Sequence, residues 1–419
     1  MLCGEVISVG DELTSGERLD TNTQWISQRL AELGIEVWYH STAGDRLDTL
    51  IDVFRRAVQR ADIVLVTGGL GPTADDLTRQ AMAEATARPL ELRPDALEHI
   101  ERLFARRQRP MPEANRIQAL FPLGSQIIPN PHGTAPGIDL LLPRTNRQPA
   151  RAFALPGVPA EMREMWHGYV VPELTKLLGH DRQVIRHHCI KCFGVGESDL
   201  EAMLPNLIQR GRDPQVGITV HKATITLRIT ARGRDDIDCQ NRMQPTIDVI
   251  HQSLGELVFG TGDDELHHAV GRLLAERSAT LATAEWGTHG ALASLLGQLP
   301  ETRQSYRGGL VLRDQAAARV LLRLTDEHSH LDPLIAETAQ RLRDAFQSDY
   351  ALVIGPAPSD IANSGLPESQ HGEATMVVGL ATPNGVTVVP RSYGGHPDIV
   401  IDRAAKTALN LLRLELCHP

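Results

Sequence analysis

The chain has 419 residues, enough for two or three domains of ordinary size. Hydrophobic residues make up 42% and charged residues 22%, the proportions of a soluble globular protein, and the formal net charge is −10 with 4% aromatic residues. An acidic chain with few rings for base stacking does not suit a polyanion, so we expect no nucleic-acid partner.

Nothing in the chain predicts export or a membrane span. Residues 1–16, MLCGEVISVGDELTSG, lack the cationic segment and long apolar core of a signal peptide, and no run of about 18 apolar residues occurs. The cysteines are odd in number, 5 in all, and scattered between Cys3 and Cys417, which does not indicate a disulfide framework. We expect a cytoplasmic protein with no membrane partner.

Residues 1–170 alternate short apolar runs with longer amphipathic ones. Strands are predicted at CGEVISVG (3–10), IEVWYHSTAG (35–44) and DIVLVTG (62–68), and helices at TNTQWISQRLAELG (21–34) and LDTLIDVFRRAVQRA (47–61). Strands that alternate with helices predict βαβ units and a mostly parallel sheet. Ligands of such sheets bind where the carboxyl ends of the strands meet.

A small α+β domain is predicted over residues 171–260. Its expected elements are a strand entering a helix, a hairpin and a long helix: CIKCFGVGESDLEAMLPNLI (189–208), ITVHKATITLRITARG (218–233) and DDIDCQNRMQPTIDVIHQSLG (235–255). The glycine- and acid-rich stretch FGTGDDELHH (259–268) predicts a linker. Residues 261–419 return to an α/β pattern and form the third predicted domain.

The stretch VLVTGGLGPTADDLTRQAMAE (64–84) has the pattern of a phosphate-binding turn. Glycines at 68, 69 and 71 follow a strand and precede a helix, so the backbone can approach an anion and present N–H groups to it. Asp75 and Asp76 would repel a bare phosphate unless a divalent cation lay between them. The alternative is that one of these aspartates caps the helix that begins near Leu77, with the glycines forming a plain turn.

Other loops at the same edge of the predicted sheet favour the ligand site over the capping alternative. Gly10-Asp11-Glu12 follows the first strand, and Gly44-Asp45 follows the second. NPHGTAPG (130–137) and LPGVPAEM (155–162) add further tight turns and one carboxylate. Helix capping does not explain carboxylates and tight turns at so many strand ends.

Several of these motifs, in this order, resemble the CinA family of competence/damage-inducible proteins. The matching segments are GDELTSG (10–16), DTNTQW (20–25), TGGLGPTADDLT (67–78), NPHGTAPG (130–137), LPGVPAEM (155–162) and FGVGESDLE (193–201). The first domain is similar to the molybdopterin-binding fold of the MoaB/MogA proteins. The resemblance implies a metal-dependent ADP-ribose pyrophosphatase, which hydrolyses ADP-ribose or a related nucleotide diphosphate, and we expect a homodimer.

The resemblance also implies the site. Asp45 and Asp76 align with the two carboxylates of the molybdopterin binders, and metal-assisted diphosphate hydrolysis would use Asp45, Asp75 and Asp76 as catalytic groups. We expect the unidentified divalent metal ion at Asp11, Asp45 and Asp76. The expected substrate-binding residues come from three loops: Thr67, Gly68, Gly69, Gly71, Pro72, Thr73, Asn130, Gly133, Thr134, Ala135, Pro136, Gly157, Pro159 and Glu161.

The third domain departs from the family pattern. The family's nicotinamide-nucleotide amidase carries A-E-S-C-T-G-G, a nucleophilic serine, and then an activating tyrosine and lysine. TAEWGTHGALASLL (283–296) keeps Glu285 but has Trp286 in the motif. Alignment through Gly308-Gly309 puts Arg303 at the serine, Arg313 at the tyrosine and Ala318 at the lysine. Because arginine offers no hydroxyl and no base at neutral pH, we expect this domain to be non-catalytic.

Two alternatives to hydrolysis remain: a module that binds a nucleotide or pterin without turnover, and retained amidase activity. A zinc site at HHCIKC (187–192) is not expected, because an alternating strand sends Cys189 and Cys192 to opposite faces and no second ligand pair follows.

Overall fold

The computed structural model describes residues 2–145, 147–179, 183–209, 211–313, 315–324, 328, 330–358, 375–392 and 396–418. The chain forms two compact units, which are described separately. The first comprises Met1–Arg186 with Ala231–Arg242, and the second comprises His187–Thr230 with Met243–Pro419. No helix within the described residues is long and apolar enough to cross a membrane.

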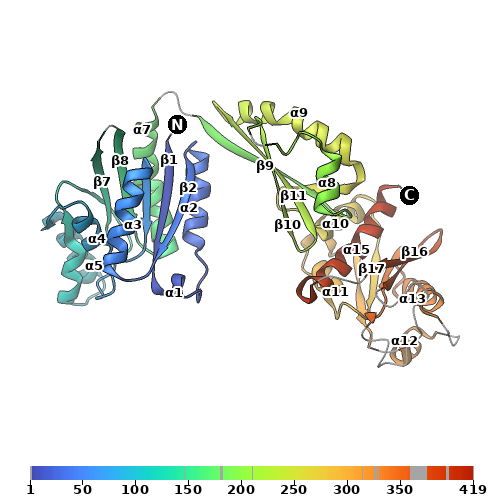
Figure 1. Ribbon diagram of the computed structural model, residues 1–419. Helices are drawn as coiled ribbons and strands as arrows, with labels where there is room; N and C mark the ends of the chain where they lie inside the picture. The colour runs from blue at the N-terminus through green and yellow to red at the C-terminus, as the bar shows by residue number, and fades with distance from the viewer. Residues whose placement is uncertain are drawn as a thin grey trace. The chain divides into compact units, whose positions relative to one another are not determined.

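The first unit is built on a six-stranded sheet in the order β2-β1-β3-β8-β7-β6 (Figure 1). The strands β2, β1, β3 and β8 run parallel, while β7 and β6 are antiparallel to their neighbours. The six strands are β1 (Cys3–Val9), β2 (Glu36–Ala43), β3 (Ile63–Thr67), β6 (Gln126–Ile128), β7 (Gly137–Arg144) and β8 (Arg147–Leu155). A separate antiparallel pair joins β4 (Leu90–Leu92) to β5 (Leu120–Pro122).

Helices connect these strands. They are α1 (Asp11–Thr14), α2 (Thr21–Glu32), α3 (Leu47–Arg60), α4 (Thr78–Ala85), α5 (Pro94–Arg106), the 3-10 turn η1 (Glu113–Ala119), α6 (Pro159–Met165), the π turn η2 (Trp166–Val170) and α7 (Val171–Leu178). Helix α2 begins where the Asp20 carboxylate accepts the N–H of Thr23 at 2.9 Å, a side-chain cap. It buries Ile26 and Leu30, one turn apart, against the sheet.

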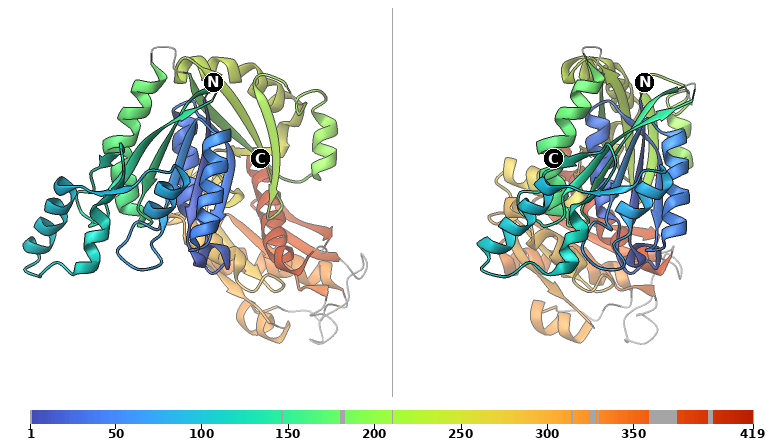
Figure 2. Two further views of the ribbon diagram at one scale, coloured as in Figure 1. Left: turned by 60° about the vertical axis from the view of Figure 1, so that its left-hand side comes forward. Right: turned by 90° about the vertical axis from the view of Figure 1, so that its left-hand side faces the viewer.

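The sheet has a separate hydrophobic core on each face. Ile7 and Val64 pack with α3, α4 and α5, while Val6 and Leu65 pack with α2, α6 and α7. Because neighbouring residues of a strand point to opposite faces, a strand covered on both faces reads as a continuous apolar run. The turned views show helices on both sides of this sheet (Figure 2).

The middle of the chain forms a four-stranded sheet in the order β10-β11-β9-β12. Its elements are β9 (Val184–Cys192), α8 (Glu197–Met203), β10 (Gln215–His221), β11 (Thr224–Gly233), α9 (Asp236–Leu254), the 3-10 turn η3 (Gly255–Leu257) and β12 (Val258–Thr261). The linker predicted at 259–268 is wrong at both ends, since 259–261 belong to β12 and 266–268 begin the next helix. Residues 258–261 pair antiparallel with β9, because a neighbouring strand edge offers backbone partners that composition cannot show.

The last part of the chain forms a five-stranded sheet in the order β14-β13-β15-β16-β17. The strands are β13 (Leu281–Glu285), β14 (Tyr306–Val311), β15 (Tyr350–Ile354), β16 (Thr375–Thr382) and β17 (Gly385–Ser392). The helices are α10 (Leu266–Glu276), α11 (Ala291–Gly297), the 3-10 turn η4 (Pro300–Thr302), α12 (Gln315–Leu322), α13 (Leu331–Phe346) and α15 (Pro397–Cys417). The α/β class and the mostly parallel first sheet are confirmed.

Candidate functional site

An open cleft of about 420 Å³ lies at the carboxyl edge of the parallel strands in the first unit. The loops after β1, β2, β3 and β8 form its wall, and the loop before β7 joins them because β7 runs in the opposite direction. Its lining is Val9, Gly10, Glu12, Arg18, Asp45, Gly68, Gly69, Leu70, Gly71, Pro72, Asp75, Asp76, Gln118, Thr134, Ala135, Pro156, Gly157, Val158 and Glu161.

The glycine loop after β3 needs its glycines for space and for backbone conformation. Gly68 has φ of +102°, and a Cβ there would collide with the carbonyl oxygen of Val9. A Cβ on Gly71 would collide with the carboxylate of Asp76. Within the described chain, the N–H groups of Gly69 and Leu70 have no hydrogen-bond acceptor. The loop can therefore donate two backbone hydrogen bonds to an anion.

Asp76 holds this loop in shape. One carboxylate oxygen accepts the N–H of Gly71 at 2.7 Å, and the other accepts the N–H of Thr73 at 2.9 Å and its hydroxyl at 2.5 Å. The capping alternative is wrong, because the N-cap of α4 is Leu77 and no side chain caps it. Since a carboxylate has about four acceptor positions, one position on Asp76 remains for a cation, and its metal and catalytic roles stay predictions.

Asp45 and Asp11 bind each other's backbone. The Asp45 carboxylate accepts the N–H of Asp11 at 3.0 Å, and the Asp11 carboxylate accepts the N–H of Asp45 at 3.0 Å. Partial burial raises the pKa of Asp45, and so do the negative charges of Asp11, Asp75 and Glu12, while the Asp11 N–H opposes the shift. A cation beside Asp45 would relieve this repulsion.

The charges on the cleft are unbalanced. Five carboxylates line it, whereas Arg18 is the one lysine or arginine among the described lining residues. The five are Glu12, Asp45, Asp75, Asp76 and Glu161. Arg18 is exposed, and it also lines an adjoining hollow of about 40 Å³ that shares Val9, Glu12, Gly68 and Gly157 with the cleft. The cleft and the hollow are therefore adjacent.

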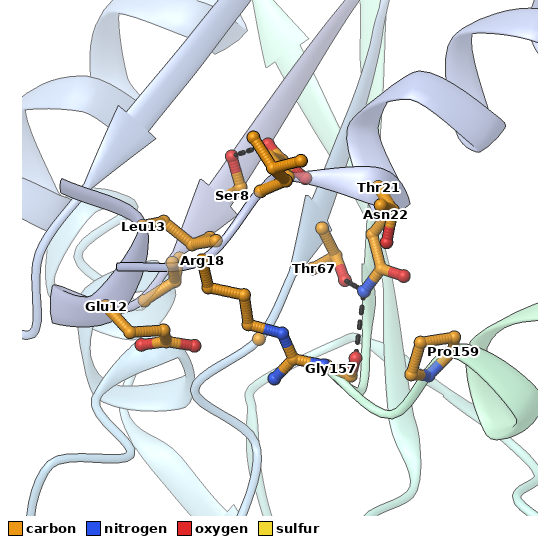
Figure 3. A pocket seen from close by; sticks show the side chains of 13 residues that line it. Ser8, Glu12, Leu13, Arg18, Thr21, Asn22, Thr67, Gly157 and Pro159 are labelled. Carbon is orange, nitrogen blue, oxygen red and sulfur yellow. Dashed lines mark hydrogen bonds between the residues drawn. The ribbon is translucent and has the colours of Figure 1, made fainter. Parts of the chain in front are cut away.

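The adjoining hollow is polar and is held by Asn22. The Asn22 amide donates to the Thr67 hydroxyl at 3.1 Å and to the Gly157 carbonyl at 2.9 Å, which joins α2 to the ends of β3 and β8 (Figure 3). Ser8 donates to the Asp20 carboxylate at 2.5 Å on the same wall. Asn22 and Arg18 were not predicted as site residues, although DTNTQW was among the motifs of the resemblance.

Asn130 is a buried residue that holds two loops of the cleft together. It is fully buried, its amide donates to the Ala135 carbonyl at 3.0 Å and to the Glu161 carboxylate at 2.7 Å, and its oxygen accepts the N–H of Gly133 at 2.8 Å. Asn130 therefore fixes the loop before β7 and orients Glu161, which lines the cleft. This positions two loops with one side chain.

Arg79 fixes the other side of the glycine loop. It is almost completely buried in α4 and donates to the carbonyl oxygens of Leu70 and Gly71. Gln118 also donates to the Leu70 carbonyl, at 3.3 Å. Burial lowers the pKa of Arg79 to about 10, and Asp76 opposes the shift. These side chains point the carbonyls inward and leave the amides for the cleft.

The structure brings most of the predicted site residues to one place, and not all of them. The cleft lining includes Asp45, Asp75, Asp76, Gly68, Gly69, Gly71, Pro72, Thr134, Ala135, Gly157 and Glu161. Thr67 and Pro159 line the adjoining hollow. The remaining predicted residues, Asp11, Thr73, Asn130, Gly133 and Pro136, lie outside both linings. At the first loop, Glu12 rather than Asp11 faces the cleft.

In the third domain, the aligned amidase positions hold no reactive pair within the described residues. Trp286 and Ala318 are buried in one hydrophobic core, while Arg303 and Arg313 are exposed. Glu285 accepts the Thr288 hydroxyl and two N–H groups at the start of α11. The nearby hydroxyl of Thr302 donates to the carbonyls of Leu296 and Leu299. The retained glutamate therefore caps a helix.

The described residues include no group of three or more histidine, cysteine, aspartate or glutamate side chains placed to hold a metal by themselves. Cys192 is buried in β9, and burial raises the pKa of its thiol to about 12. Any cation in the cleft would need further ligands from a bound molecule or from water.

Comparison with known proteins covers almost the entire chain. A family model described as "Probable molybdopterin binding domain" matches residues 5–176, one described as the damage-inducible protein CinA KH domain matches 187–260, and one described as the CinA C-terminal domain matches 263–416. A CinA-like protein of Thermosynechococcus vestitus is 36% identical over 424 residues, 99% of both chains. A CinA-like protein of Synechococcus elongatus is 33% identical, over 99% of this chain and 98% of its own.

Among solved structures, the protein CinA of Thermoplasma acidophilum, described as having unknown function, is 30% identical. It covers 41% of this chain and 98% of its own, with a TM-score of 0.37. The relatives match along the full length, and the family models match all three parts of the chain in order. The chain belongs to the CinA family, and its first domain matches the molybdopterin-binding domain model.

Proposed function

We propose that the cleft of the first domain binds a nucleotide diphosphate of the ADP-ribose type together with a divalent cation, and hydrolyses the diphosphate. The observation that carries the proposal is the meeting of free loop amides with five carboxylates and a single guanidinium. The amides suit a phosphate, whereas the carboxylates repel one. If a phosphate enters together with a divalent cation, the amides bind the phosphate and the cation offsets its repulsion by the carboxylates.

The donor set fits a hard cation that arrives with its ligand. Magnesium is usually held by one or two carboxylates and by substrate phosphates, and not by a cage of protein ligands. Asp45 would hold the cation, and Asp75 and Glu12 are further carboxylates of the cleft lining whose charges act on Asp45. When bound, the cation neutralises phosphate charge and acidifies a coordinated water.

In this reaction a water oxygen bonds to one phosphorus, the bridging P–O bond breaks, and AMP and ribose 5-phosphate form as dianions with release of two protons. The chain's part is to orient the diphosphate. The N–H groups of Gly69 and Leu70 would donate to its oxygens, and Arg18 would pair with one of its two phosphate groups. The adjoining hollow of about 40 Å³ beside Asn22 has room for one small polar group of the ligand.

The test is turnover of ADP-ribose by the full chain, with magnesium or manganese, followed by chromatography of AMP. We expect chelation of the cation to abolish activity. Asp45→Asn should lower kcat/KM by about 100-fold, because it removes a charge that holds the cation. Asp48→Asn is the matched control, since Asp48 is exposed, pairs with Arg46 and lies outside the cleft. Undiminished turnover in chelator would contradict the proposal.

One observation favours a second candidate function, a binding module without turnover. The described residues hold no preformed metal cluster. This candidate predicts tight nucleotide binding and no AMP under any divalent cation. Binding and turnover are therefore measured on the same preparation.

Retained amidase activity is the third possibility that the sequence left open. The buried Trp286 and Ala318 and the occupied Thr302 hydroxyl oppose it. We expect the full chain to release no ammonia from nicotinamide mononucleotide. Ammonia release that persists in Asp45→Asn would assign an amidase to the third domain.

A further inference from the structure

A second cavity of the first unit lies at the opposite end of the sheet from the cleft. Its volume is about 600 Å³, and it is lined by the ends of α3 and α4 and by the β7–β8 hairpin. Figure 1 shows the two ends of the sheet: the N-terminus lies at one end, and α1, which follows β1, lies at the other. We call this cavity the basic pocket; its lining contains Arg55, Arg88, Arg144 and Arg147.

Three of these arginines are anchored by neutral partners. Arg55 donates to the carbonyls of Glu84 and Ala85 at 3.2 Å each, and Arg88 donates to those of Leu123 and Leu141 at 3.1 Å each. Arg147 donates to the Gln59 carbonyl at 2.8 Å. A backbone carbonyl holds a guanidinium in place and leaves its full charge uncompensated. Each guanidinium also has N–H groups to spare, since it carries five.

Arg144 has a different role. Its head is nearly buried and forms an ion pair with Asp62 at 2.5 Å, and it also donates to the Ala61 carbonyl at 2.9 Å. Arg144 thus ties the β7–β8 hairpin to the end of α3, and its charge is neutralised. No carboxylate is among the described lining residues of the basic pocket, and none of the described carboxylates pairs with Arg55, Arg88 or Arg147.

The pocket also has an apolar wall. The half-buried Val58 and the exposed Pro143 line it beside the arginines, whereas Phe54 and Leu142, also in the lining, are only 3% and 5% exposed. Pockets for small ligands commonly measure about 300 to 1,000 Å³ and combine an apolar wall with a few fixed polar groups. The pocket therefore exceeds what an inorganic phosphate ion would fill. The net charge of −10 for the whole chain opposes a nucleic acid and makes three unpaired arginines in one cavity an exception to the general charge.

We propose that the basic pocket is a second ligand site and binds a small organic phosphate, with a phosphate group on the arginines and an apolar body on Val58 and Pro143. Guanidinium groups suit phosphate because their planar N–H pairs match its oxygens. The site is separate from the cleft, so the proposal stands or fails independently of diphosphate hydrolysis.

The first experiment maps protection of arginines in the full-length wild-type chain. AMP is the probe, and adenosine and inorganic phosphate are the comparisons; arginines are modified with phenylglyoxal, and peptides are read by mass spectrometry. We expect AMP to protect Arg55, Arg88 and Arg147. Arg18 reports on the cleft, and Arg56, which pairs with Asp52 on the same helix, reports on general exposure. Protection confined to Arg18, or equal protection by adenosine, would overturn the proposal.

The second experiment measures AMP affinity by calorimetry in variants. The double variant Arg55→Gln with Arg147→Gln should weaken the site mapped above by about tenfold or more, since each removes a charged donor to phosphate. Arg56→Gln should leave the affinity unchanged. Equal affinity in the double variant and the wild type would overturn the proposal. If circular dichroism shows that the double variant is unfolded, the proposal is tested by the protection pattern of the wild-type chain alone.

Discussion

The Asp76 carboxylate is predicted to be the main support of the glycine loop, and Asp76→Ala tests this directly. The substitution removes the acceptor of three hydrogen bonds, two of them from the N–H groups of Gly71 and Thr73. A hydrogen bond to a charged group contributes about 1.5–3 kcal/mol. Asp76 is only half-buried, so we expect the loop to lose about 2–3 kcal/mol in total.

Amide hydrogen exchange reports this loss at the two donors. At 1.36 kcal/mol per tenfold change, the N–H groups of Gly71 and Thr73 should exchange about 30- to 150-fold faster in Asp76→Ala than in the wild type. Mass spectrometry of peptides that span residues 70–74 provides the measurement. The exchange of β3, which does not depend on Asp76, should stay the same.

The neighbouring aspartate gives a matched control. Asp75 is exposed and accepts no hydrogen bond from Gly71, so Asp75→Ala should change exchange at Gly71 by less than about twofold. If Asp75→Ala and Asp76→Ala accelerate exchange equally, or if neither does, the loop is held by other contacts and the reasoning is refuted.

Three further predictions concern the same cleft. The pKa of Asp45 is raised above its ordinary value of 3.8, so folding favours the protonated carboxyl. The contribution of this group to the free energy of unfolding is fully present below pH 3.8 and is lost as pH rises through the folded-state pKa. Asp45→Asn should therefore raise the melting temperature at pH 7 without added cation, and a gain that persists undiminished at pH 3 would contradict this. Arg18→Gln should weaken ADP-ribose binding by about tenfold with no change in melting temperature, measured by calorimetry and thermal unfolding, because Arg18 is exposed. Asn130→Ala should cost about 2–4 kcal/mol in urea unfolding, because it leaves buried groups near Gly133 and Glu161 without partners; a loss below 1 kcal/mol would show that water replaces the amide.

The elements and the position of the cleft could be predicted from the sequence because they depend on local pattern. The apolar run before Thr67 is buried on both faces, which explains why it is continuous and not alternating. Each predicted loop follows a parallel strand, and parallel strands end at one edge. Asp45 and Asp75, 30 positions apart in sequence, were placed together by this argument, and their charges do interact.

The sequence does not show which of the two neighbouring aspartates holds the glycine loop and which is exposed. Asp75 and Asp76 are chemically identical neighbours, and only the backbone path of the loop directs one carboxylate to Gly71 and leaves the other exposed. The same holds for β12, where glycine and acidic residues indicate a linker, yet pairing with β9 makes a strand. Arg18 was missed because nothing in its neighbourhood shows that a flexible side chain lies beside a loop 50 positions away.

The hydrogen bonds of Gly71, Thr73 and Asp76 that shape the glycine loop start and end within residues 68–79. Thr67, Gly68 and Leu70 are also bound from outside this segment, by Asn22, Pro156, Leu155 and Gln118. Gly71, Thr73, Asp76, Thr78 and Arg79 form a self-contained set of donors and acceptors. Such a segment keeps its conformation before any ligand arrives, so binding need not freeze mobile backbone and loses less entropy. It also makes residues 68–79 transferable: placed after the parallel strand of another sheet, the segment should carry its anion-binding geometry with it.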